Sequence, residues 1–339
     1  MKKLLNNLYI TSDGGYVHKE RETIVVEREG KKIFQAPFHA FEGIYCFGHV
    51  MVSPALMGSC GKRGIELAFF TGYGRLQARV LGPQTGNVLL RRAQYRLADS
   101  NPALLARIFV GAKLANSRQI LLKQLRNHGQ NEMLKQCSAQ LAGGLRRLGF
   151  SSDTDSIRGI EGDSAAGYFA VFNELISAEQ RGDFQFSGRT RRPPLDEVNA
   201  MLSFSYSILT NEIASALQGV GLDPYVGFLH TDRPGRLSLA LDMLEEFRAW
   251  WCDRFVLTLI NRKQVKQSDF VQEVSGAVRM KDDARKELLT AWQERKQEQI
   301  THPFLKEKIP IGLLPHTQAM LLAKYLRGDL ENYPPFFTR

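Results

Sequence analysis

Cysteine is scarce in this 339-residue chain: the four residues Cys46, Cys60, Cys137 and Cys252 lie far apart and form no C-x-x-C pair. That spacing argues against a zinc ribbon or a disulfide framework and suits a reducing cytoplasm. No apolar run approaches the roughly 18 residues needed to cross a bilayer. The N-terminal MKKLLNNLYITSDGG also lacks the long apolar stretch of a signal peptide. We therefore expect a cytoplasmic protein with no membrane partner.

Nucleotide-binding glycine motifs are missing as well. The segment GSCGKRG (58–64) lacks both the upstream glycine and the Ser or Thr after lysine that a phosphate-binding loop requires. The segment GYGRLQ (72–77) does not match the dinucleotide-binding pattern. The sequence therefore gives no support to ATP or NAD chemistry.

Acidic residues are rare between positions 75 and 147. This segment has thirteen Lys and Arg but only Asp99 and Glu132 as acids, a net charge of +11 against +10 for the whole chain. Segregated positive charge of this size is typical of a protein that binds a polyanion. Tyr95 and several glutamines alternate with the arginines, which favours nucleic acid. The alternative is a solvated basic surface on ordinary helices.

Short β-rich runs fill the first eighty residues, including TIVVE (23–27), GIYCF (43–47) and GIELAFF (64–70). Runs this short, rich in Ile, Val, Tyr and Phe and bounded by turn residues, predict a small β domain. LGPQTGN (81–87) has the composition of a turn, and beyond it the apolar residues recur at helical spacing to near the C-terminus. We expect an α+β protein with an N-terminal β domain (1–86) and a larger all-α domain (87–339).

One carboxylate occupies an unusual place. At 100° per residue, Glu161 lies in the middle of an apolar face of the helix predicted at 156–176. Burying a charge there costs several kcal/mol unless a cation or strong donors meet it. The alternative is a glutamate near a helix N-terminus, stabilised by the helix dipole and by a pair with Arg158.

The stretch HTDRPGRLSLALDMLEE (230–246) raises a similar question. Periodicity places Asp242, Glu245 and Glu246 opposite the apolar face of a helix starting near Leu237, as expected for a solvated acidic face. Asp242 and Glu245 are nevertheless i, i+3 neighbours that could both reach one cation. A turn at 234–235 brings the chain back toward His230. Carboxylates with one imidazole suit Mg²⁺ or Mn²⁺ better than Zn²⁺.

A basic loop precedes another helix in SGRTRRPPLDEVNAMLSFSYSIL (187–209), where Asp196 is a plausible N-cap. Arginines can grip phosphates bidentately, so this loop is a candidate DNA contact, or alternatively a charged interdomain loop. With the basic segment, the candidate DNA-binding residues are Arg75, Arg79, Arg91, Arg92, Arg189, Arg191 and Arg192.

Several ordered motifs together resemble a known family. They are IxGxEGxxAxxYF around Glu161, GRxRRPPxDxxNAxLSFxYxxL (188–209), GLDPYVGFLH (221–230) and LALDxxEEFR (239–248). INRKQVKQSDF (260–270) and QAMLLAKYLRGDLENYPPF (318–336) continue the match. The chain resembles the spacer-acquisition integrase of CRISPR systems, CRISPR-associated protein one, over essentially its whole length. It looks most like the form that accompanies type I-C systems.

This resemblance implies a metal-dependent DNA endonuclease and integrase, which inserts prespacer DNA into the CRISPR array by 3′-OH transesterification. Glu161, His230 and Glu245 match the family's three metal-ligand positions, with Asp242 as an auxiliary acid and Mg²⁺ or Mn²⁺ as the cofactor. The implied partners are double-stranded DNA of prespacer and repeat, a second copy of the chain, and a dimer of CRISPR-associated protein two. The N-terminal domain would carry the dimerisation and partner contacts.

Two other interpretations remain open from the residues. A non-catalytic DNA-binding scaffold would explain the basic segment without a metal site. A metal-dependent phosphodiesterase acting on other substrates would explain the acids but not the basic segment. Glu246 points about 100° around the helix from Glu245, so we expect its removal to be mild.

Overall fold

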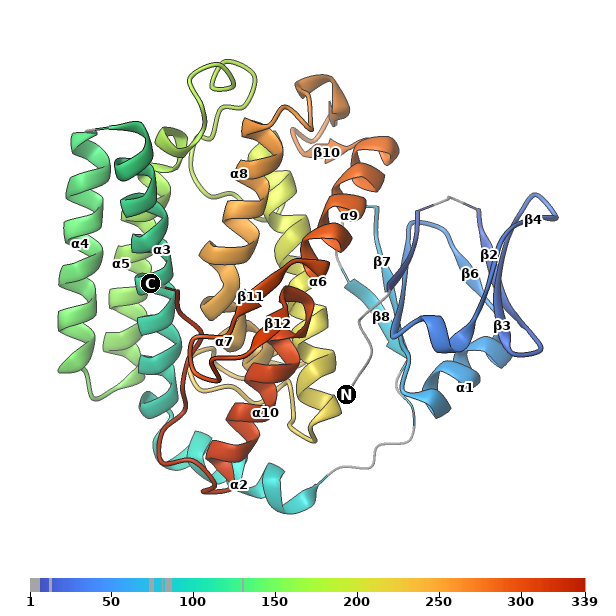
Figure 1. Cartoon of the computed structure of the whole chain (residues 1–339), viewed down its shortest axis with the longest axis horizontal. Helices are drawn as coiled ribbons and strands as arrows, with labels where there is room; N and C mark the ends of the chain where they lie inside the picture. Colours follow the sequence, from blue (N-terminus) through green and yellow to red (C-terminus); the bar gives the residue numbers. More distant parts are fainter. Residues whose placement is uncertain are drawn as a thin grey trace. The chain divides into compact units, whose positions relative to one another are not determined.

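The computed structural model describes residues 7–11, 14–72, 76–80, 82, 87–129 and 131–338. The chain forms two compact units (Figure 1). We call Met1–Thr85, Met280–Ile300 and Ile309–Leu313 the N-terminal unit. We call Gly86–Arg279, Thr301–Lys308 and Leu314–Arg339 the helical unit.

The N-terminal unit contains two four-stranded sheets. In the first, β1 (Asn7–Ile10), β5 (Gly43–Phe47) and β7 (Glu66–Phe70) run parallel, and β8 (Leu76–Val80) is antiparallel to β7. The second has the order β4 (Lys31–Pro37), β3 (Thr23–Arg28), β2 (Tyr16–Glu20) and β6 (Met51–Val52). Helix α1 (Pro54–Arg63) supplies Leu56 and Cys60 to a core that also contains Val17, Ile24 and Ile44.

Part of the C-terminal half also belongs to the N-terminal unit, namely helix α9 (Asp282–Gln297) and the short helix η5 (Ile311–Leu313). Arg285 of α9 donates from Nη1 to the carbonyl of Gly72 at 2.6 Å. The sequence analysis predicts a single boundary at residue 86 and places every later residue in the all-α domain, whereas in the structure Met280–Ile300 and Ile309–Leu313 belong to the N-terminal unit. Helical periodicity identifies α9 as a helix but carries no information on a contact between residues 213 positions apart.

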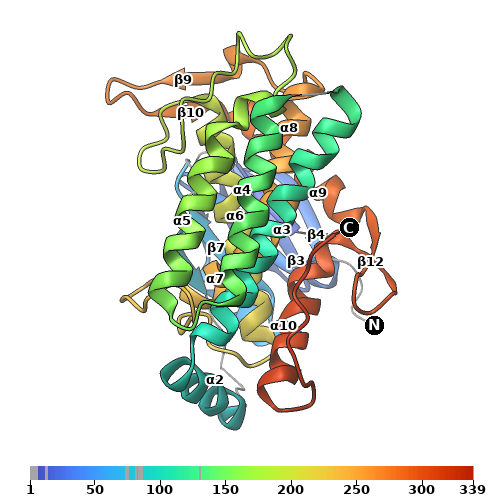
Figure 2. The ribbon, with the colours of Figure 1, turned by 90° about the vertical axis from the view of Figure 1, so that its left-hand side faces the viewer.

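The helical unit is built around three long helices, α3 (Ala103–His128), α4 (Glu132–Gly149) and α5 (Thr154–Ala170). They run alongside one another in both views (Figures 1 and 2). Helix α7 (Ser238–Phe247) packs against α3 and against α6 (Glu197–Gly219). The helical unit also contains α2 (Val88–Ser100), α8 (Arg254–Asn261), α10 (Leu314–Leu326) and the short η2 (Phe172–Leu175) and η4 (Gln267–Asp269), whereas the short η1 (Phe38–Ala40) lies in the N-terminal unit.

The α+β fold is confirmed, with two additions that periodicity did not predict. Short two-stranded ladders join β9 (Phe270–Gln272) to β10 (Val278–Met280), and β11 (Gln299–Thr301) to β12 (Lys308–Pro310). The second addition is a π-helical turn, η3 (Arg248–Asp253), between α7 and α8. Such turns interrupt regular helices at functional sites more often than elsewhere, and η3 begins three residues after Glu245.

Local signals set the helix starts. The side chain of Asp196 accepts a hydrogen bond from Asn199 N at 2.6 Å and caps α6, as the sequence predicted. Asp153 caps α5 in the same way. All four cysteines are buried free thiols. Over the described part of the chain, no helix combines the length and the apolar character needed to cross a membrane.

Candidate metal centre

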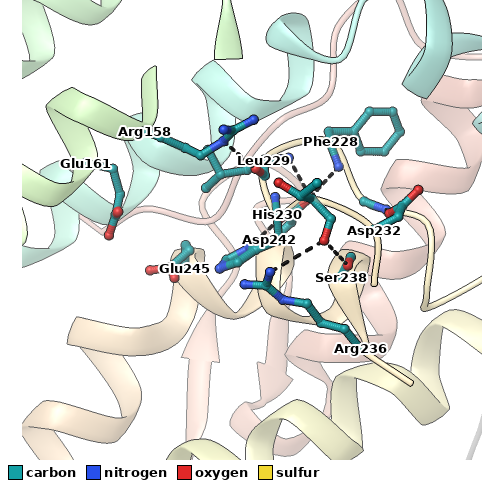
Figure 3. Close-up of polar contacts among 12 residues, drawn as sticks. Arg158, Glu161, Phe228, Leu229, His230, Asp232, Arg236, Ser238, Asp242 and Glu245 are labelled. Carbon is teal, nitrogen blue, oxygen red and sulfur yellow. Dashed lines mark hydrogen bonds and ion pairs between the residues drawn. The ribbon is translucent and has the colours of Figure 1, made fainter. Parts of the chain in front are cut away.

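Asp242 holds the loop that carries His230. Its side chain on α7 is fully buried, and Oδ2 accepts the backbone N–H groups of Phe228 at 2.6 Å and Leu229 at 3.0 Å. Oδ1 accepts from His230 twice, from the backbone N at 3.0 Å and from Nδ1 at 2.7 Å (Figure 3). A carboxylate with four donors has little capacity left for a cation. Asp242 is therefore placed to orient His230 and to leave its Nε2 available.

The same loop needs a glycine at position 227. A Cβ built there would lie 2.8 Å from Asp242 Oδ2 and 2.9 Å from the Cβ of Ser238, closer than side-chain carbons approach such atoms. Helix α5 fixes the loop from the other side, because Arg158 donates from Nε to the carbonyl of Leu229 at 3.1 Å. Arg158 also pairs with Asp155. The alternative in which Arg158 pairs with Glu161 is not the arrangement that the structure shows, because Glu161 pairs with Lys113.

Glu161 on α5 and Glu245 on α7 meet at one ammonium group, that of Lys113 on α3. Lys113 Nζ lies 2.8 Å from Glu245 Oε2 and is also hydrogen-bonded to Glu161 Oε1. The exposed side-chain fractions are 7% for Lys113, 3% for Glu245 and 24% for Glu161. Figure 3 shows the Glu161 carboxylate and the His230 ring approaching Glu245 from different segments.

Arg248, the first residue of η3, holds Glu245 from its other side. Its Nη1 lies 2.8 Å from Oε1 and 3.2 Å from Oε2 of Glu245. Burial by itself would raise the pKa of Glu245, but the nearby charges of Arg248 and then Lys113 outweigh it and hold that pKa far below its usual range. The two basic residues therefore favour the ionised form of Glu245.

The acids of 242–246 are not a solvated face, so that interpretation is wrong. Asp242 and Glu246 are fully buried, and Glu245 is 3% exposed. The sequence analysis did not identify Lys113 as part of this site and grouped it with the basic residues of 75–147. The feature that could have indicated its role is weak: Lys113 is the single lysine in the mainly apolar run ALLARIFVGAKLAN (103–116). Arg248 could have been found from its i+3 spacing to Glu245.

The donor set fits a divalent cation. Two carboxylates from different helices already converge on one positive charge, and the neighbouring imidazole has its second nitrogen fixed in orientation. Oxygen donors with one imidazole suit Mg²⁺ or Mn²⁺. Within the described residues, no three His, Cys, Asp or Glu side chains stand close enough together to enclose an ion as they are. Lys113 lies between the two carboxylates.

Glu246 points away from this centre into a separate polar cluster. Its carboxylate accepts from Tyr333 Oη at 2.5 Å, Gln318 Nε2 at 2.8 Å and Phe336 N at 2.7 Å. Asn116 of α3 joins the cluster by donating to the carbonyls of Glu246 at 2.7 Å and Phe336 at 3.0 Å. Burial raises the pKa of Glu246 to about 7. Glu246 therefore ties α7 to the segment 333–338.

A stack of charged and aromatic groups supports Arg248. The guanidinium groups of Arg248 and Arg189 both lie over the ring of Tyr206, at 4.5 and 5.2 Å from its centroid. The Tyr206 hydroxyl donates to Asp253, whose pKa burial raises to about 6. Arg189 also donates to Asn199 Oδ1 at 2.6 Å and to Ser203 Oγ at 3.0 Å. The partly buried Arg189 therefore already has partners within the protein, and its DNA contact stays a prediction.

The other candidate DNA-binding arginines differ in their surroundings. Arg92 on α2 and both Arg191 and Arg192 in the basic loop are exposed. Arg91 is partly buried and donates from Nε to the carbonyl of Gly221 at 3.3 Å.

Arg79 in the N-terminal unit is 7% exposed and pairs with Glu66 at 2.8 Å, so its charge is already matched. Arg75 lies outside the described residues.

Comparison with known proteins decides the family. The family model described as "CRISPR associated protein Cas1" matches residues 8–294. The chain belongs to the Cas1 family. The "CRISPR-associated endonuclease Cas1 1" of Chlorobaculum tepidum is 52% identical, and the "CRISPR-associated endonuclease Cas1 2" of Rhodospirillum rubrum is 48% identical; each comparison covers 100% of both chains. The expected family and its endonuclease activity are confirmed, whereas the type I-C assignment stays a prediction.

Solved Cas1-like structures share the fold. A "Casposase bound to integration product" superposes with a TM-score of 0.83 at 22% identity, covering 97% of this chain and 92% of that one. A Cas1 protein from Thermotoga maritima gives a TM-score of 0.80 at 23% identity, covering 96% and 97% of the two chains. Both structures therefore share the fold of this chain over nearly its whole length.

Proposed function

We propose that this Cas1-family endonuclease acts in CRISPR adaptation as a metal-dependent integrase, with Glu161, His230 and Glu245 holding one Mg²⁺ or Mn²⁺. The convergence of two carboxylates, the buried Glu245 of α7 and the partly buried Glu161 of α5, on a single cationic group carries the proposal. The Cas1 family implies divalent-metal dependence, and the choice of these three residues and of the metal is ours.

Each protein group has a separate task in this proposal. Asp242 and the backbone of residues 228–230 orient the imidazole of His230, and Arg248 keeps Glu245 ionised and in place. A bound divalent cation would supply polarisation of the scissile phosphate and stabilisation of the charge on the leaving 3′ oxygen. In integration a 3′-OH of the incoming DNA attacks phosphorus in the repeat and a 3′ oxygen leaves. One phosphodiester bond forms as one breaks, so no ATP is needed.

We assign DNA as a partner because of the positive charge on exposed arginine side chains. Arg92, Arg191 and Arg192 are exposed and belong to segments rich in Lys and Arg. We infer contacts to DNA phosphates, which give affinity and position more than base recognition. Solved structures of the same fold include one titled "Cas6-RT-Cas1--Cas2 complex" and one titled "Crystal structure of TtCas1-DNA complex". We accordingly propose a homodimer that holds prespacer DNA together with a dimer of Cas2.

Integration into a plasmid tests the assignment. The protein, its Cas2 partner and a duplex with free 3′-OH ends are incubated with a supercoiled repeat-bearing plasmid, with and without Mn²⁺. Glu161→Gln, His230→Ala and Glu245→Gln should each abolish strand transfer and leave DNA binding intact. Any two combined should be little worse than one, because ligands of one ion act as a unit.

Glu132→Gln serves as the matched control, since Glu132 is an exposed acid at the start of α4. It should integrate as the wild type does. Normal integration by the three site variants would remove the metal site, and full activity without a divalent cation would remove the metal dependence.

A further inference from the structure

Lys113 is an unusual lysine. It lies inside α3, its side chain is 7% exposed, and among the described residues it is the one whose charged group contacts both Glu161 and Glu245. Lysine is almost never buried unless it is paired. Its ammonium therefore has a defined place, between the two carboxylates to which we assign the cation.

The charges at this point are already balanced. Two carboxylates, Glu161 and Glu245, face two cationic side chains, Lys113 and Arg248. Without Lys113 the two carboxylates would repel each other in a poorly solvated place. With Lys113 in position, an arriving divalent cation meets a positive charge on the same oxygens that it needs. The ammonium and the cation compete for one place.

The two basic residues differ in how easily they can move. Arg248 is confined, because its guanidinium lies over Tyr206 while Nη1 contacts both oxygens of Glu245. Lys113 is held at its tip by the two carboxylates and has a flexible four-carbon stem. Lys113 is therefore the group that yields.

We propose that Lys113 is a built-in counter-ion, which keeps Glu161 and Glu245 together before a divalent cation binds and moves off them when the cation and a DNA phosphate bind together. This inference rests on the proposed metal site. Once displaced, the ammonium needs an anionic partner, and a DNA phosphate oxygen provides one. Cation binding and DNA binding then strengthen each other reciprocally. The enzyme would hold the metal weakly until its substrate is present.

Mn²⁺ binding in the absence of catalysis tests this directly. Free Mn²⁺ is measured by electron paramagnetic resonance during titration of the full chain at low temperature, with and without a short DNA duplex. For the wild type, DNA should tighten Mn²⁺ binding. Lys113→Met should bind Mn²⁺ without DNA at least about tenfold more tightly than the wild type, because a unit charge at this range changes the binding of a single proton by one to three orders of magnitude. DNA should then add less.

Lys135→Met is the matched control. Lys135 is an exposed lysine on α4 whose ammonium is 3.8 Å from Glu132, so its loss should leave both Mn²⁺ affinities unchanged. Lys113→Met binding Mn²⁺ no more tightly than the wild type would overturn the counter-ion role. Mn²⁺ affinity that is insensitive to Glu161→Gln and Glu245→Gln would instead overturn the metal site itself.

A second measurement uses only the wild type, in case Lys113→Met does not fold. Acylation of lysine amines, read by peptide mass spectrometry, reports the access to each ammonium group. Lys113 should react slowly in the metal-free protein and faster when Mg²⁺ alone is raised to saturation, because no DNA phosphate then covers the displaced ammonium. Lys135 should react equally in both conditions. Slow reaction of Lys113 that persists at saturating Mg²⁺ would contradict its displacement.

Discussion

The imidazole of His230 is held by Asp242, whose Oδ1 lies 2.7 Å from Nδ1. The same carboxylate accepts three backbone N–H groups of residues 228–230, so it fixes both the ring and the loop that carries the ring. A carboxylate behind a ligating histidine sets its tautomer and orientation. In the proposed metal site Asp242, expected as an auxiliary acid, would thus act through His230.

Asp242→Asn should weaken Mn²⁺ binding by about 10–100-fold, the usual effect of losing a group that orients a ligand. It should also lower the melting temperature, because an amide NH₂ would face backbone donors. Asp232→Asn is the control: Asp232 is an exposed acid of the same loop, and its replacement should leave Mn²⁺ affinity within error of the wild type. Wild-type Mn²⁺ affinity in Asp242→Asn would show that another group orients the ring.

Removing Glu246 should destabilise the protein, whereas the helical wheel predicts only a mild effect on cleavage and integration. Glu246→Ala leaves the Tyr333 hydroxyl and the backbone N–H of Phe336 without their acceptor, whereas Gln318 Nε2 keeps Tyr333 Oη and the carbonyl of Pro334. Each buried donor left unpaired costs about 1–3 kcal/mol. Urea unfolding should therefore show a loss of several kcal/mol, against a change below about 0.5 kcal/mol for the exposed Glu132→Ala. Equal midpoints for the two variants would contradict the role of this cluster.

Neighbouring arginines of the basic loop should separate into two functions. Arg191→Ala should weaken duplex binding and reduce the slope of log K against log[salt] by about 0.9 for one lost phosphate contact. Its free energy of unfolding should change by less than about 0.5 kcal/mol. Arg189→Ala should instead lower stability, because Asn199 and Ser203 lose a donor and Tyr206 loses a stacked guanidinium. The reverse pattern would mean that the two roles are exchanged.

Stability should fall as the pH rises through the range in which Asp253 titrates. Burial raises the pKa of Asp253 to about 6, above the value of about 3.9 for an exposed aspartate. Between these values the folded state keeps a proton that the unfolded chain has lost, so the free energy of unfolding decreases with pH. In Asp253→Asn, whose amide oxygen can still accept from Tyr206, this contribution should vanish. Urea midpoints from pH 4 to 6.5 check it, and parallel profiles for the two proteins would contradict it.

Local signals predicted much of the fold. The runs at 23–27 and 43–47 match β3 and β5, and Asp196 caps α6 as expected. Periodicity also identified Glu161 as a carboxylate on a face where a charge needs a partner. These features depend on residues within a few positions of one another, which is the range over which helix and strand patterns carry information.

Contacts between distant residues could not be predicted in this way. A helical wheel placed Glu245 and Glu246 opposite the apolar face of α7, but that opposite side is covered by α3 and by the segment 333–338. Lys113 and Glu161 are 48 positions apart, and no spacing rule joins them. The basic segment was likewise treated as one surface, although its charge is divided between exposed residues such as Arg92 and buried ones such as Lys113.

The polar cluster around Glu246 also affects the order in which the protein can fold. Asn116 donates to the carbonyl of Phe336, a residue 220 positions later. During synthesis α3 and α7 leave the ribosome well before Phe336 does, at about 5–20 residues per second. During the seconds in between, the carboxylate of Glu246 lacks the hydrogen-bond donors of Tyr333 and Phe336. The packing around α7 in the helical unit can therefore be completed only after residue 336 has been synthesised.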